Sequence, residues 1–179
     1  MQVFRPTDTA QLEAPTAAAS SWTGELLHIH IAPVASSEMA ELDEATLVAG
    51  RGIEGDRYLL GTGTYSKLPG VREVTLFEME VLEALGRNDP PLQQGPIRLD
   101  PSEHRRNLTV RGVPLGHLVS LRFRIGDVVL RGARLNFPCK YLERLLKRPV
   151  YQALYNRSGL NCVIETGGVI RRGAVIEPL

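Results

Sequence analysis

The sequence predicts a mainly β protein, a β-barrel that carries two or three short α-helices. Three observations lead to this fold class. Residues 121–125 alternate between apolar and polar side chains, and an apolar run at 128–130 follows across Gly126-Asp127, which is the pattern of a β-hairpin. The 17 glycines and 12 prolines suit many short strands joined by tight turns. The chain lacks the regular alternation of strands and long helices that a parallel α/β sheet requires.

We expect one domain with a flexible N-terminal tail. The chain has 179 residues, a common length for a single domain. Residues 1–22 form the expected tail, because residues 14–21 are small, polar and aperiodic and bury too little apolar surface to offset their ordering entropy. The barrel domain is expected over residues 23–179.

Local patterns place the expected elements along this domain. Thr75 and Glu78 have the spacing of a capping box, which predicts a helix that begins there and ends at Gly86. An apolar stripe at residues 141–146 predicts a short helix that Pro149 ends. The remaining expected elements are strands at 26–31, 74–76, 108–110, 161–164 and 174–176 and a short helix over 150–155.

Composition limits the possible functions. The formal net charge of +1 argues against a nucleic-acid partner, whose phosphates demand a basic excess. No apolar run reaches the ~18 residues of a membrane span, and no signal peptide is expected. The two cysteines cannot form a disulfide framework in a chain of this length, so we expect a reduced, cytoplasmic protein.

Cys139 is the first candidate for chemistry. It follows Asn136-Phe-Pro138, in which Asn is a favoured N-cap and Pro suits a first helical turn. Cys139 is therefore expected in the first turn of a helix, where unpaired N–H groups favour an anion. Nearby basic residues such as Arg134 and Lys140 favour a thiolate, the form that binds a soft metal or carries sulfur. The alternative is an inert cysteine that fills a gap, which is also the expectation for Cys162.

Two turns rich in arginine are the second candidate feature. Gly55-Asp56-Arg57 ends a glycine-rich stretch, and Arg105-Arg106-Asn107 precedes a predicted strand. The planar guanidinium group matches phosphate or carboxylate, and an Asn amide can both donate and accept. The alternative is that these arginines form surface ion pairs with Asp56, Glu54 or Glu103.

Several familiar motifs are excluded. Residues 50–55 spell G-x-G-x-x-G, but no apolar helix follows, so a dinucleotide site is rejected. His28 and His30 share one strand face as a plausible pair, whereas His104 and His117 are isolated. Without H-E-x-x-H or C-x-x-C, a structural zinc site is not expected, and no serine nucleophile elbow occurs.

An ordered series of segments resembles a known family. The segments run Gly52-Ile-Glu-Gly-Asp-Arg-Tyr58, Arg72-Glu-Val-Thr-Leu76, Arg105-Arg-Asn-Leu-Thr-Val-Arg-Gly112, Phe123-Arg-Ile-Gly-Asp-Val-Val-Leu130, Pro138-Cys139, Arg157-Ser-Gly159 and Gly167-Gly-Val-Ile-Arg-Arg-Gly173. The series is similar to the MOSC domain, the C-terminal module of eukaryotic molybdenum-cofactor sulfurases. The resemblance covers about residues 24–178.

This resemblance implies a barrel of the type found in the pyruvate kinase barrel domain, with a pocket for molybdenum–molybdopterin cofactor. The family's cysteine, a molybdenum ligand or persulfide carrier, matches Cys139. The Arg-x-Asn element that contacts the pterin in amidoxime-reducing members matches Arg105 and Asn107. The other matching positions are Asp56 and Arg57 in the glycine turn and the basic residues Arg72 and Arg157.

The resemblance leaves two main functions open. One is a cofactor-dependent reductase of N-hydroxylated compounds, which needs an electron donor. The other is a non-catalytic carrier of cofactor or persulfide sulfur, whose partners would be a cysteine desulfurase or an acceptor molybdenum enzyme. A barrel that has lost its cofactor pocket is the third possibility.

Pyridoxal phosphate is not expected, because the chain lacks the desulfurase domain of the full sulfurases. Arg105-Arg106-Asn107 also departs from the Arg-Glu-Asn of many bacterial members, and the helical C-terminal extension of those members is missing.

Overall fold

The computed structural model describes residues 22–66 and 72–179. The tail expected over residues 1–22 therefore lies outside the described residues, except for Trp22. The Trp22 ring packs near Phe123, with 6.5 Å between the ring centroids.

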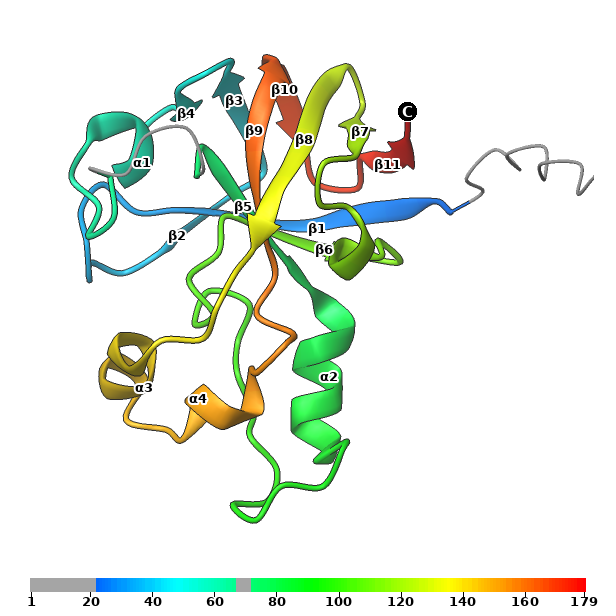
Figure 1. Cartoon of the computed structure of the whole chain (residues 1–179). Helices are drawn as coiled ribbons and strands as arrows, with labels where there is room; N and C mark the ends of the chain where they lie inside the picture. The colour runs from blue at the N-terminus through cyan, green and yellow to red at the C-terminus, as the bar shows by residue number, and fades with distance from the viewer. Residues whose placement is uncertain (1–21, 67–71) are drawn as a thin grey trace, which may run out of the picture.

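Seven strands close into a β-barrel, which confirms the predicted fold class (Figure 1). The strand order is β11-β7-β8-β9-β5-β6-β1, and β1 pairs with β11 to close the sheet. All neighbours are antiparallel except β5 and β6. The barrel strands are β1 (Gly24–Ile31), β5 (Val74–Glu78), β6 (Leu108–Arg111), β7 (Arg122–Ile125), β8 (Val128–Leu135), β9 (Leu160–Thr166) and β11 (Val175–Pro178).

The predicted hairpin is present as β7 and β8, with Ile125 opposite Val128 across Gly126-Asp127. The alternation of apolar and polar residues along β7 matches its two faces, and the apolar residues Phe123 and Ile125 are fully buried in the barrel. On the outer face, Arg124 pairs with Glu177 at 2.6 Å.

Strand β8 contains a β-bulge near its end. Gly132 pairs with Cys162, whereas Arg134 pairs with Asn161, so Ala133 is an extra residue on β8. Leu135, after the bulge, packs against the barrel core.

A smaller sheet lies beside the barrel and leads into the glycine-rich turn. Its order is β10 (Gly168–Arg171), β3 (Glu44–Val48) and β4 (Gly52–Ile53). The short strand β2 (Ala40–Leu42) adds to the outer edge of β1. The helical turn α1 (Arg57–Leu60) follows β4, and Asp56 caps it by accepting from the Tyr58 backbone N–H at 3.0 Å.

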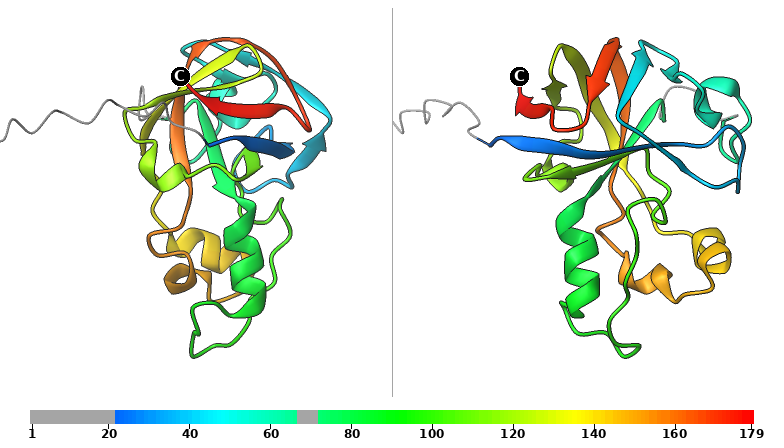
Figure 2. Two further views of the ribbon diagram at one scale, coloured as in Figure 1. Left: turned by 90° about the vertical axis from the view of Figure 1, so that its right-hand side faces the viewer. Right: turned by 180° about the vertical axis from the view of Figure 1, so that it is seen from behind.

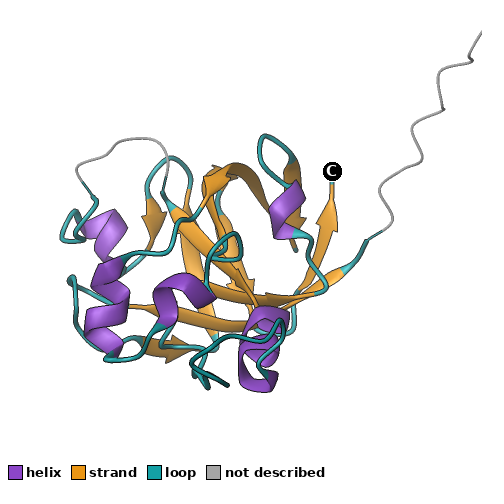
Figure 3. Cartoon of the chain, turned by 60° about the horizontal axis from the view of Figure 1, so that its bottom comes forward, coloured by secondary structure: helices purple, strands orange, loops and turns teal. Residues whose placement is uncertain are grey.

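Three helices gather at one end of the barrel (Figures 1 and 2). They are α2 (Met79–Arg87), α3 (Lys140–Leu146) and α4 (Val150–Ala153), and Figure 3 shows them from their own side. A 3-10 turn, η1 (Leu115–His117), lies between β6 and β7. The helices enclose a second core, which includes Phe77, Leu85, Leu142 and Val150. Within the described ranges, no helix has the length and apolar character needed to cross a membrane.

The capping-box prediction for Thr75 and Glu78 is wrong. Residues 74–78 form strand β5, and α2 begins at Met79 with Glu78 as a cap that makes no side-chain bond. The helix also continues past Gly86 and ends at Asn88, whose φ is 57°. Pairing of β5 with both β6 and β9 outweighs the local capping signal.

Gly159 fixes the close approach of β9 to β5. Its φ is +89°, and a Cβ there would collide with the carbonyl oxygen of Leu76. We therefore expect Gly159→Ala to lower the free energy of unfolding by at least about 2 kcal/mol, because it combines backbone strain with overpacking.

The matched control is Gly86→Ala, since a Cβ on this helical residue meets nothing within 4 Å. It should raise stability by about 0.5 kcal/mol. Urea unfolding measures both variants, and equal midpoints would contradict the proposed close contact.

Candidate functional site

Cys139 is half-buried in the segment between β8 and α3, and it lines two adjoining cavities. The first, which we call the arginine cavity, measures about 170 Å³. Its polar lining includes Arg72, Arg106, Arg134 and Asn136. The second, the side cavity, measures about 60 Å³. Its lining includes Arg57, Arg105, Arg106, Ser36 and Tyr141.

The local structure around Cys139 differs from the predicted capping arrangement. Cys139 is itself the N-cap of α3, with extended backbone at φ −135° and ψ 144° and no side-chain capping bond. Its carbonyl oxygen accepts from Leu142 N at 3.1 Å. Asn136 is not the cap, because α3 begins only at Lys140, and its backbone N–H donates to Gly159 O at 2.8 Å. Pro138 disfavours helical backbone at the preceding residue, so the chain stays extended until Cys139.

Arg106 brings a positive charge to both cavities. Its guanidinium donates to Ser158 O at 3.2 Å, to Ser158 Oγ at 3.0 Å and to His104 O at 3.2 Å. These acceptors are all neutral. Burial lowers the pKa of Arg106 to about 10, while Tyr58 and Cys139 act in the opposite direction. Arg106 therefore remains a cation at neutral pH with no carboxylate to compensate it among the described residues.

Arg72 and Arg134 add two further cations to the arginine cavity. The Arg72 guanidinium carbon lies 4.8 Å from the Tyr65 ring centroid, and its buried Nε has no acceptor in the described part of the chain. Burial, followed by repulsion from Arg72, lowers the pKa of Arg134. Asn136 Nδ2 is also buried without a partner there. Buried donors are normally paired, so these groups indicate a site for an anionic or acceptor-rich ligand.

Asp56 and Asn107 occupy the interior behind the cavities. Both are fully buried, and neither lines a cavity. Asp56 Oδ2 accepts from Asn107 Nδ2 at 3.1 Å, from Arg57 Nη1 at 3.1 Å and from Ala32 N at 3.2 Å. Asn107 Oδ1 accepts from the Thr75 hydroxyl at 2.8 Å. In this arrangement the two residues hold the arginine-bearing turns together.

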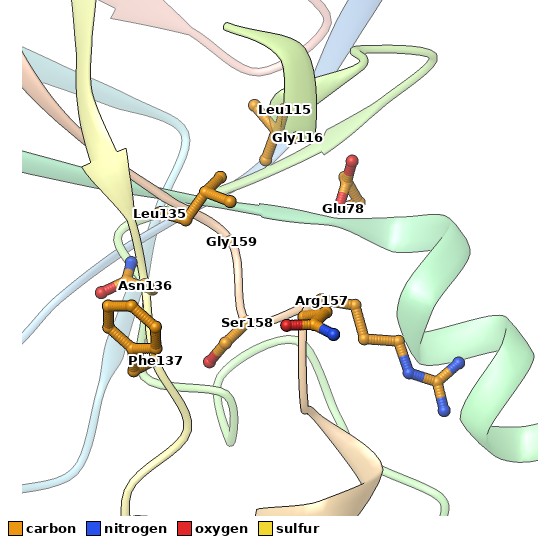
Figure 4. Close-up of a pocket in the computed structure, with 10 residues that line it drawn as sticks. Glu78, Leu115, Gly116, Leu135, Asn136, Phe137, Arg157, Ser158 and Gly159 are labelled. Atoms are coloured by element: carbon orange, nitrogen blue, oxygen red, sulfur yellow. The ribbon is translucent and has the colours of Figure 1, made fainter. Parts of the chain in front are cut away.

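Arg157 lies apart from Cys139. It lines a different cavity of about 70 Å³ together with Glu78 and Ser158 (Figure 4). Its guanidinium extends toward α2, and it donates to Ala153 O at 2.7 Å and Asp89 O at 2.9 Å. The six predicted cofactor residues thus separate into Arg57, Arg72 and Arg105 at the cavities, buried Asp56 and Asn107, and distant Arg157.

Sequence reasoning placed Arg106 in a candidate turn without assigning it a cofactor contact, and it did not select Arg134, Tyr58 or Tyr65, although all four line the arginine cavity. Arg106 stands between two residues that were selected, and the sequence does not show the left-handed backbone of Arg105, with φ 61°, that accompanies the different placement of the two arginines. Arg134 could have been selected from the sequence, because it is a basic residue close to Cys139 along the chain.

The other candidates, Cys162 and the histidine pair, have structural surroundings and do not line the two cavities at Cys139. Cys162 is fully buried in the barrel, and burial raises the pKa of its thiol. His28 and His30 stack with ring centroids 5.9 Å apart, and His28 Nδ1 lies 2.6 Å from Glu41 Oε1. No group of metal ligands is found over residues 22–66 and 72–179.

The fold and the site define a closed β-barrel domain that presents a half-buried cysteine to an arginine-lined cavity. Residues 70–177 match the family described as the MOSC domain, and the chain belongs to that family. Comparison with curated proteins gives no match.

Solved structures share the fold. YuaD of Bacillus subtilis superposes with a TM-score of 0.70 at 19% identity, covering 87% of this chain and 97% of that one. YiiM of Escherichia coli gives 0.60 at 16% identity, over 88% and 69%. YiiM of Geobacillus stearothermophilus gives 0.63 at 12% identity, over 87% and 75%.

The buried carboxylate of Asp56 supports the site through its four donors. We expect Asp56→Asn to lower the free energy of unfolding by about 3 kcal/mol, because an amide loses the charge and leaves buried donors unpaired. Urea denaturation followed by circular dichroism measures the change.

Asp43→Asn is the control, since the Asp43 side chain is 97% exposed and lies 3.6 Å from Arg172. It should change stability by less than about 0.5 kcal/mol. A similar small effect at Asp56 would show that the buried network contributes little.

Proposed function

We propose that the chain binds a molybdenum–molybdopterin cofactor in the arginine cavity, with Cys139 as a sulfur ligand to molybdenum. The observation that carries the proposal is the half-buried cysteine beside Arg72, Arg106 and Arg134, none of which has a carboxylate partner in the described residues. Thiolate is a soft ligand, and arginine forks match a phosphate.

The residues present fit this group. The unpaired donors Arg72 Nε and Asn136 Nδ2 are of the type that a phosphate or a pterin carbonyl would satisfy. Tyr58 and Tyr65 supply aromatic surface at the same cavity. Ligand pockets typically measure about 300–1,000 Å³, so a cavity of about 170 Å³ would enclose one part of the cofactor and leave the rest against the neighbouring surface.

The activity that we propose is reduction of N-hydroxylated compounds. The bound molybdenum centre would supply the two-electron chemistry. Cys139 would fix the metal, and Arg72, Arg106 and Arg134 would hold the anionic end of the cofactor and orient it. Asp56 and Asn107 would act indirectly, because they position the arginine-bearing turns.

This activity requires a separate electron donor as the protein's partner. We place the protein in the reducing cytoplasm, where the two cysteines, which form no disulfide, would persist as thiols.

Cofactor loading tests the proposal. After anaerobic expression in a cofactor-producing host, we expect wild-type protein to retain molybdenum and pterin, and Cys139→Ala to lose at least about tenfold in molybdenum content. Metal analysis and pterin fluorescence provide the readout. Cys162→Ala, which removes the sulfur inside the barrel, should retain the cofactor. Absence of molybdenum from the wild type would contradict the proposal.

Turnover separates the reductase from the carrier that is the second candidate. Loaded protein supplied with a chemical reductant should reduce a hydroxylamine or amidoxime, whereas Cys139→Ala should not. A loaded protein without turnover that carries a reductant-sensitive persulfide on Cys139 would favour the carrier. Intact-mass spectrometry detects that persulfide.

A further inference from the structure

Arg105 was expected from the family resemblance to contact the pterin, but it does not line the arginine cavity in which we propose that the cofactor binds. It lines the side cavity together with Cys139, and it also lines a wider groove of about 250 Å³. We call the latter the outer groove. Its apolar lining consists of Met39, Leu145 and Leu146. Arg105 therefore stands where a small cavity at the sulfur meets a larger, open surface.

The Arg105 guanidinium is fixed in place but incompletely paired. Its Nη1 donates to Ser37 O at 2.7 Å, whereas its Nη2 is buried with no acceptor among the described residues. Its backbone adopts φ 61°, and its carbonyl oxygen accepts from Arg57 Nη2 at 3.0 Å. A held guanidinium with an unpaired N–H loses little conformational entropy when it binds an acceptor.

The surroundings of Arg105 favour an anionic acceptor. Burial and then the nearby Arg57 lower the pKa of Arg105, whereas Tyr141, Tyr58 and Asp56 act in the opposite direction. Asp56 already accepts from Arg57. Two carboxylates line the outer groove. Glu103 is occupied by both terminal nitrogens of Arg148, at 2.6 and 2.9 Å, and Glu38 is exposed and forms no ion pair with Arg105 in the described part of the chain.

Hydroxyl groups line the small cavity beside Arg105. Ser36 and Tyr141 hydrogen-bond to each other across it and join the loop after β1 to α3. The side cavity of about 60 Å³ has room for a group of a few atoms, because one water occupies about 30 Å³ of liquid. A carboxylate or an N–O group has this size.

We infer that Arg105 forms a second anion subsite, which binds the carboxylate of a substrate whose apolar part lies in the outer groove. The reducible group of that substrate would then enter the side cavity toward Cys139. This inference rests on the proposed function for the identity of the reaction, but the subsite itself is a property of the cofactor-free chain.

The test measures protection of Cys139 from iodoacetamide in cofactor-free protein, with benzoate and its neutral isostere benzamide as the probes. We expect benzoate to slow alkylation at millimolar concentration and benzamide to have little effect. Arg105→Gln should weaken the benzoate effect at least about tenfold, because a charge-assisted hydrogen bond is lost. Buried Cys162 provides an unreactive internal reference.

Two further variants keep the test decisive. Arg105→Lys preserves the charge and should retain a preference for benzoate over benzamide even if Arg105→Gln loosens the loop at Ser37. Arg134→Gln, in the arginine cavity, should leave benzoate protection unchanged. Equal protection by benzoate and benzamide, or loss of protection in Arg134→Gln but not in Arg105→Gln, would overturn the subsite.

The molybdenum content of each variant separates this inference from the proposed function. If wild-type protein holds molybdenum but shows no preference for benzoate, the proposed subsite at Arg105 is contradicted and the cofactor proposal is not. If the protein shows the preference but never holds molybdenum, the cofactor proposal is contradicted and the anion site remains.

Discussion

The buried carboxylate of Asp56 is the interaction on which the site depends. It joins the end of β1 through Ala32, the first turn of α1 through Tyr58, and the segment before β6 through Asn107. Asn107 in turn holds Thr75 on β5. One ionised side chain thus connects segments that are far apart in sequence, and each of them carries or adjoins an arginine of the cavities. A charge can occupy such a position because four donors replace its lost hydration.

The hydrogen bonds of Asp56 and Asn107 hold in place the turns whose arginines line the cavities, so several positive charges lie close together there. Arg57 has a carboxylate partner, whereas Arg106 donates to neutral acceptors, Arg72 lies over aromatic rings, and Arg134 forms no ion pair within the described ranges. Repulsion among these cations disfavours the folded state, and Asp56 offsets only part of it. A bound anion would relieve the rest, so ligand binding and folding stability should be coupled.

The sequence predicted the parts of the fold that local patterns determine. The hairpin of β7 and β8 follows from alternation and a two-residue turn, and α3 follows from an apolar stripe. The start of α2 was misplaced because the capping signal at Thr75 is local, whereas the two strands that flank β5 come from distant segments.

The candidate site was predicted in part. The presence of Cys139 and two arginine turns was foreseen, but the direction of each side chain was not. Arg105 has left-handed backbone and its side chain lines a different cavity from the neighbouring Arg134 and Arg72, while tertiary contacts with Arg57 and Ser37 hold it. Burial of Asp56 and Asn107 is likewise a tertiary property that residue type alone does not reveal.

The bulge at Ala133 determines which side chains of β8 face the barrel core and which face the site. Because side chains alternate along a strand, the extra residue lets Leu135 pack against the barrel core while Arg134 lines the arginine cavity. A regular strand with the same residues and no bulge would exchange those two directions and aim the Arg134 guanidinium at the barrel core. The bulge therefore helps to determine the chemistry of the site, together with the identity of its side chains.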